Sequence, residues 1–117
     1  MYIQLDGQLS GTGLYTINGV PIDRDTLSLS PETLSWLDSW LEKYWKAKYS
    51  GFRHYQRKLR KKQLIDLDLE GLHLKRVIER EVQQNNPDCF ITYWSEALGA
   101  HLNDEGCIIY NWKEMVS

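Results

Sequence analysis

The clearest alternation of apolar and polar positions in this chain lies between residues 30 and 50. Apolar side chains recur there at steps of three and four residues, a spacing that places them on one side of an α-helix. These residues are Leu34, Leu37, Leu41, Tyr44 and Trp45. Two tryptophans, at positions 36 and 40, widen the stripe, so the pattern predicts a helix that is covered on two sides.

The residues at both ends of this segment support the helix. Ser30 is a good N-cap, because its hydroxyl can accept a hydrogen bond from a first-turn N–H, and Pro31 suits the first helical position. Glu32 lies near the positive end of the helix dipole, whereas Lys46 and Lys48 lie near the negative end. Both charges therefore favour a helix over residues 30–50.

Two short strands are predicted before this helix. Residues 2–6 alternate in the manner of a strand, and residues 14–17 form a second apolar run, with glycines between the two. The pair Asn18-Gly19 is a strong turn signal because both residue types accept a positive φ. We therefore expect the second strand to end sharply there.

The segment that follows the helix is basic and helical in spacing. Residues 52–62 place Phe52, Tyr55 and Leu59 at steps of three and four, and Gly51 offers a stop for the preceding helix. This pattern predicts either a short helix or an irregular basic arm.

From residue 64 the period changes to two. Apolar and acidic residues alternate there: Ile65, Leu67 and Leu69 with Asp66, Asp68 and Glu70. Such alternation buries one face of a strand and exposes the charged face to water. We therefore predict a strand over residues 64–69, with Asp68 as the cap of the helix that follows.

The rest of the chain completes an α+β domain. An apolar stripe up to Val82 predicts a second helix, and residues 89–95 are rich in β-formers, so strand, helix and strand make a βαβ unit. A polar loop over residues 96–106 and a last strand over residues 107–112 follow. The prediction is one domain over residues 1–117, a two-layer α+β fold with a mixed sheet of about five strands. The Trp-rich helix and the second helix cover that sheet.

Charge is strongly segregated along the chain. Residues 46–62 contain eight Lys or Arg and no acid, which leaves six basic and sixteen acidic residues elsewhere. The two cysteines, Cys89 and Cys107, are too few for a disulfide framework or a zinc site and are expected to be buried thiols. No apolar run reaches the roughly 20 residues that span a bilayer, and the N-terminal residues do not resemble a signal peptide. We expect a soluble, cytoplasmic protein.

Several residues invite a catalytic interpretation. Asp66 and Asp68 on one strand face would suit Mg²⁺, but no glycine-rich phosphate loop follows, so a solvated strand face is the favoured interpretation. None of His54, His73 and His101 has a nucleophile or carboxylate at a triad spacing, so each is expected to be a surface or half-buried imidazole. The sequence therefore predicts no catalytic residue, no metal site and no cofactor.

The basic segment leaves two kinds of partner open. Its cations and its rings, which include Tyr49 and Phe52, suit phosphates and bases, which favours a small nucleic-acid-binding regulator working through residues 46–62. The acidic remainder and a pI of 5.9 argue against a polyanion and leave a protein partner or surface salt bridges to residues 66–70.

In its general character the chain resembles the immunity proteins that bacteria keep against contact-dependent and other polymorphic toxins. The resemblance is carried by its size, its α+β pattern and the opening YIQLDGQLSGTGLYTINGVPIDRDTLSLSP before a Trp-rich helix. It implies a toxin inhibitor, not an enzyme, that binds a cognate toxin, commonly a nuclease, by stoichiometric protein–protein interaction. From their charge we expect the contacts to come from two sets of residues: Asp66, Asp68, Glu70, Asp104 and Glu105, or Arg53, Arg57 and Arg60.

Overall fold

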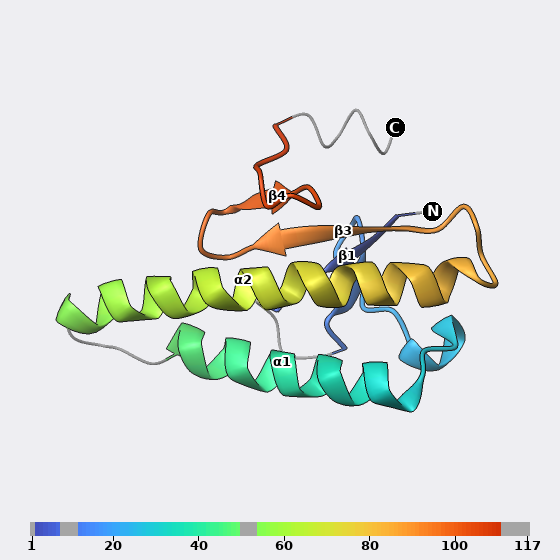
Figure 1. Cartoon of the computed structure of the whole chain (residues 1–117), viewed down its shortest axis with the longest axis horizontal. Helices are drawn as coiled ribbons and strands as arrows, with labels where there is room; N and C mark the ends of the chain where they lie inside the picture. Colours follow the sequence, from blue (N-terminus) through green and yellow to red (C-terminus); the bar gives the residue numbers. More distant parts are fainter. Residues whose placement is uncertain (1, 8–11, 50–53, 111–117) are drawn as a thin grey trace.

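A computed structural model describes residues 2–7, 12–49 and 54–110, with side chains for all of these except residues 48, 49 and 54–61 (Figure 1). Its elements, in chain order, are β1 (Tyr2–Leu5), β2 (Leu14–Thr16), the short 3-10 helix η1 (Arg24–Leu27), α1 (Pro31–Tyr49), α2 (His54–Gln83), β3 (Phe90–Ser95) and β4 (Ala100–Leu102). The two N-terminal strands and the Trp-rich helix lie where the sequence predicts them.

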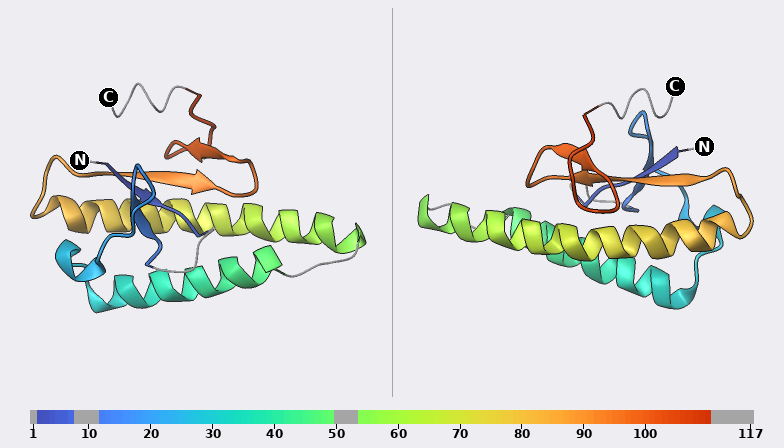
Figure 2. Two further views of the ribbon diagram at one scale, coloured as in Figure 1. Left: turned by 180° about the vertical axis from the view of Figure 1, so that it is seen from behind. Right: turned by 45° about the horizontal axis from the view of Figure 1, so that its top comes forward.

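The strands form one mixed sheet in the order β2-β1-β3-β4. β1 and β3 are parallel, whereas the two outer pairs are antiparallel. In Figures 1 and 2 the two helices lie side by side and the strands lie against them. The predicted two-layer α+β fold is therefore confirmed, with four strands in the described residues in place of about five.

Trp40 connects all three parts of the core. It is fully buried, its indole N–H donates to the carbonyl of Leu67 on α2 at 2.9 Å, and its ring packs against Tyr44 and Tyr93. The neighbouring Leu41 is only half-buried. The aromatic side of α1 thus faces α2 and β3 together, as the wide apolar stripe predicts.

The start of α1 is tied to the far end of α2. The Ser30 hydroxyl accepts from the Thr33 N–H at 3.2 Å, so the predicted N-cap is confirmed. The Glu81 carboxylate accepts from the Ser30 N–H at 2.7 Å and also from the Ser30 and Thr33 hydroxyls. One side chain therefore satisfies first-turn donors of α1 and fixes the helix pair at this end.

The predicted strand over residues 64–69 is wrong, because this segment belongs to the 30-residue helix α2. In this helix the apolar residues belong to two stripes. Along the sequence they alternate with acids, and this alternation has the same period of two as a strand. The burial of these side chains also differs in part from the strand prediction, since Asp68 is buried whereas Ile65 and Leu69 are exposed. Asp68 lies within the helix and is not its cap.

Two further predictions about the C-terminal half need correction. β3 is present, but its parallel partner is β1 and not residues 64–69, so no compact βαβ unit exists there. β4 forms inside the predicted loop, and of the predicted last strand the described part makes only one bridge, between Ile108 and Leu102. Residues 111 and 112 lie outside the described part of the chain.

One thiol and one imidazole, Cys107 and His101, differ from expectation. Cys89 is buried as predicted, but Cys107 is exposed. His101 is buried against Trp94, whose ring it meets edge-on, and this burial lowers the pKa of the imidazole. His73 is exposed, and the side chain of His54 lies outside the described residues.

Gly71 provides a test of how closely α2 approaches the sheet. A Cβ at this position would lie 2.5 Å from the Tyr93 ring, so Gly71→Ala must displace that ring. Although alanine favours helices, we expect the variant to lose about 1–3 kcal/mol of unfolding free energy in urea titrations, as overpacked cores do. Ser39→Ala, at an exposed site of α1, is the matched control and should be neutral or stabilising. Equal effects of the two substitutions would contradict the close approach.

Candidate functional site

A buried polar cluster joins α2 to the end of β3. Asp68 is 4% exposed, and its carboxylate accepts a hydrogen bond from the Tyr93 hydroxyl at 2.6 Å and another from the Ser95 hydroxyl. The Ser95 oxygen in turn accepts from the Leu98 N–H at 3.0 Å. The cluster therefore fixes the turn between β3 and β4 to the middle of α2.

Burial dominates the electrostatics of this cluster. Desolvation raises the pKa of Asp68, and the hydrogen bonds from Ser95 and Tyr93 offset only part of that effect. Desolvation together with the charge of Asp68 also raises the pKa values of Tyr44 and Tyr93, so both remain neutral phenols. With its carboxylate enclosed, Asp68 cannot serve as the predicted surface contact, and that prediction is wrong for this residue.

The helical geometry also separates the proposed carboxylate pair. Residues two apart on a helix point to nearly opposite sides, so Asp66 is exposed while Asp68 faces the sheet. Glu70 lies half-buried between the helices, where its carboxylate meets Lys43 at 2.9 Å and accepts from the Trp36 indole N–H at 3.0 Å. Among the described residues, no three His, Cys, Asp or Glu side chains are grouped so that they could hold a metal ion.

The remaining predicted acids lie in the loop after β4. Asp104 forms an ion pair with the buried Lys75, and its carbonyl accepts from Arg76, so this loop rests on α2. Glu105 is exposed in the same loop. Gly106 places the loop against Leu72, since a Cβ there would lie 3.6 Å from the leucine side chain.

The predicted basic contacts are Arg53, Arg57 and Arg60. Arg53 lies outside the described residues. Arg57 and Arg60 fall in the first turns of α2, but their side chains lie outside the described part.

Three exposed apolar side chains lie on α2 and on the turn between β3 and β4 that is bonded to it. Ile65 and Leu69 are one helical turn apart on α2 and are 41% and 63% exposed. Leu98, which is 45% exposed, lies in the turn, where its N–H donates to the Ser95 hydroxyl and that hydroxyl donates to Asp68 on α2. We call these three residues, with the exposed acids Asp66, Asp104 and Glu105, the α2 surface.

Sequence reasoning predicted the acids of the α2 surface and missed its apolar part. The predicted strand places Ile65 and Leu69 on its buried face, and Leu98 falls in the predicted polar loop over residues 96–106. The available signal was the spacing of four residues between Ile65 and Leu69 within an otherwise uninterrupted run of helix formers.

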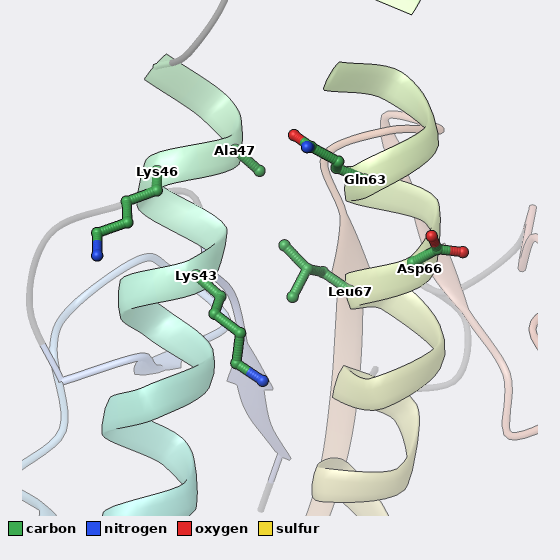
Figure 3. A pocket seen from close by; sticks show the side chains of 6 residues that line it. All are labelled: Lys43, Lys46, Ala47, Gln63, Asp66 and Leu67. Atoms are coloured by element: carbon green, nitrogen blue, oxygen red, sulfur yellow. The ribbon is translucent and has the colours of Figure 1, made fainter. Parts of the chain in front are cut away.

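A separate groove lies between the C-terminal part of α1 and the N-terminal half of α2 (Figure 3). Its volume is about 420 Å³, and Ala47 and Leu67 form its apolar floor, with Gln63 beside them. Lys43 and Lys46 border it on α1, but both ammonium groups already pair with glutamates, at 2.9 and 3.0 Å. Asp66 also lines the groove, although in Figure 3 its carboxylate points away from α1.

Comparisons with known proteins give no relative of this chain: no family model, curated protein or solved structure matches it. Within the described ranges, neither helix is long and apolar enough to cross a membrane.

The Asp68 cluster predicts a pH-dependent stability. Since the folded-state pKa of Asp68 is raised, its contribution is fully present below about pH 3.9 and is lost as the pH rises through the folded-state pKa. Asp68→Asn removes this titration, and an amide cannot accept both hydroxyls as a carboxylate does, which costs about 1–3 kcal/mol. The stability difference between wild type and variant, measured in urea, should therefore shrink from about pH 4 to pH 7.

The control is Asp66→Asn, two residues from Asp68 on the exposed side of α2. Since this variant keeps Asp68, the difference in unfolding free energy between wild type and Asp66→Asn should stay nearly constant over the same pH range. A pH-independent difference for Asp68→Asn would rule out a titrating carboxylate in the cluster.

Proposed function

We propose that this chain is a bacterial immunity protein, which binds a cognate toxin of the nuclease class in the cytoplasm and neutralises it by stoichiometric protein–protein interaction. The observation that carries the proposal is the α2 surface. Ile65 and Leu69 on α2 and Leu98 in the turn bonded to α2 expose large apolar groups, and Asp66, Asp104 and Glu105 on the helix and on the loop that rests on it are exposed acids. An apolar centre with a charged rim is typical of protein–protein interfaces.

The rigidity of this surface supports a binding role. Leu98 is held by the Ser95–Asp68 cluster, and Asp104 by Lys75, so both loops are fixed to α2 before any partner arrives. A preformed surface loses little conformational freedom on binding, and more of its contact energy is available for affinity.

The charges favour a basic partner at this place. Asp66 and Glu105 are exposed carboxylates, and they can take the positions that phosphates occupy on a nuclease. Of the acids predicted for this role, Asp68 is buried and Glu70 is half-buried between the helices, so the exposed contact set reduces to Asp66 and Glu105, with Asp104, which is exposed but pairs with Lys75, beside Glu105.

The test uses the toxin domain encoded beside the reading frame of this chain. We expect a 1:1 complex by native mass spectrometry, and loss of toxin activity in its presence. Leu69→Asp should weaken the complex at least tenfold, because it places a charge in the apolar centre of the interface. Val20→Asp is the matched control, since Val20 is 58% exposed near β2 and outside the α2 surface, and it should bind like wild type.

Two results would count against the proposal. One is full protection by the Leu69→Asp protein. The other is tight, salt-sensitive binding of DNA or RNA that depends on the basic residues 46–62, which would favour the alternative of a nucleic-acid-binding regulator.

A further inference from the structure

The turn signal Asn18-Gly19 has no part in the α2 surface, but this pair of residues also carries chemistry of its own. An asparagine before a glycine can lose its side-chain amide, because the glycine nitrogen is not shielded by a side chain and can approach the asparagine carbonyl. The chain contains one other pair that reacts by the same route, Asp6-Gly7. The structure places the two pairs in opposite surroundings.

Asn18-Gly19 lies in the hairpin loop that follows β2. The Gly19 N–H donates to the carbonyl of Thr16 at 2.9 Å, and the Thr16 N–H donates to the carbonyl of Val20 at 2.8 Å. Gly19 has a φ of 85°, whereas Asn18 has no positive φ, since Ser28 alone among the described residues other than glycine has one. This combination is a type I turn followed by a glycine bulge, a common three-residue hairpin loop.

This loop is open to water and is closed only by its own hydrogen bonds. Asn18 and Gly19 are exposed, and no atom of the described residues except their chain neighbours lies within 4 Å of the place of a Gly19 Cβ. A third bond across the loop runs from the Val20 N–H to the Thr16 hydroxyl at 3.1 Å. Exposed bonds at a loop tip open at low free energy, so the Gly19 nitrogen is released while the rest of the sheet stays folded.

The pair Asp6-Gly7 is enclosed by comparison. Asp6 is 5% exposed, its N–H donates to the carbonyl of Gly13 at 3.0 Å, and its carboxylate accepts from the Gln4 amide at 3.2 Å. A Cβ on Gly7 would lie 2.6 Å from the Tyr44 ring, so that ring packs directly on the glycine. A reaction at Gly7 would therefore require the end of β1 to separate from α1.

We propose that Asn18 is a site of spontaneous deamidation in the folded protein, through opening of the hairpin loop, and that Asp6 is protected. The Gly19 nitrogen loses its proton to hydroxide and bonds to the side-chain carbonyl carbon of Asn18, whose amide nitrogen takes a proton from water and leaves as ammonia. Water then opens the succinimide ring at one of its two carbonyls. The product is aspartate or isoaspartate, and either one adds a negative charge to the formal net charge of −2.

The two products affect the loop differently. Aspartate leaves the main chain as it was and is a common turn residue, so this product keeps the bonds of the loop. Isoaspartate lengthens the main chain between Thr16 and Val20 by one carbon, and the bonds between these two residues no longer fit. The loop lies outside the α2 surface, so the inference does not depend on the proposed toxin.

The test is peptide mapping of the full folded chain by mass spectrometry after incubation at neutral and at mildly alkaline pH. Trypsin releases residues 1–24 as one peptide, because Arg24 is the first Lys or Arg, so both pairs are followed together. The same synthetic peptide is the unfolded reference, since an isolated hairpin is at best marginally stable in water. We expect Asn18 to react about tenfold more slowly in the folded chain than in the peptide, because the loop must first open. Its rate should rise with hydroxide concentration, and Asp6 should isomerise in the peptide alone.

A matched pair of variants tests the role of the loop. Thr16→Val removes the hydroxyl that accepts from the Val20 N–H and keeps a branched side chain. It should raise the deamidation rate of the folded chain about two- to tenfold, the equivalent of one net hydrogen bond. Thr26→Val is the control, since it removes an exposed hydroxyl that donates to the Asp23 carbonyl outside the loop, and it should leave the rate unchanged.

Three outcomes would overturn the inference. One is protection of Asn18 by more than about a hundredfold relative to the peptide, which exceeds what the bonds of the loop supply. Another is an equal effect of Thr16→Val and Thr26→Val on the rate. The third is isomerisation of Asp6 in the folded chain with as little protection, relative to the peptide, as Asn18.

Discussion

The hydrogen bonds from Tyr93 and Ser95 to the buried Asp68 fix the long helix to the sheet. A carboxylate without water must have such donors, since an unsatisfied buried charge would cost several kcal/mol. The two hydroxyls come from the same strand, two residues apart and therefore on the same face of β3. The helix can turn only this one face to the strand, so the junction also sets the rotation of α2 about its axis.

That rotation explains which side chains remain outside. With Asp68 and Gly71 directed to the sheet, Ile65 and Leu69 lie on the flank of the helix beside them and remain exposed. The tyrosine that bonds Asp68 also requires a residue without a side chain at position 71, where any Cβ would meet its ring. The apolar part of the α2 surface is thus a direct consequence of the buried junction.

The sequence predicts well where local signals and tertiary packing agree. The cap at Ser30, the stripe of α1 and the first two strands all follow from spacing and turn chemistry. The sequence misleads over residues 64–69, because a period of two arises on a strand and also from two stripes on a helix. The donors that make burial of Asp68 favourable, Tyr93 and Ser95, lie 25 and 27 residues away, and no local pattern contains them. The same error hid the apolar centre of the candidate site, since a strand would have buried Ile65 and Leu69.

One stripe of α2 connects Ile65 and Leu69 to the loop after β4. Ile65, Leu69, Leu72, Arg76 and Glu79 follow each other at steps of three and four residues, which places them on one side of the helix. Fourteen residues separate the first from the last, or about 21 Å at the rise of an α-helix. Between them, the loop after β4 contacts the helix at Leu72 and Arg76. A standard interface covers about 800 Å² on each partner, enough to extend along this stripe. A partner that meets Leu69 can therefore also contact the loop after β4, which would form the middle of such an interface.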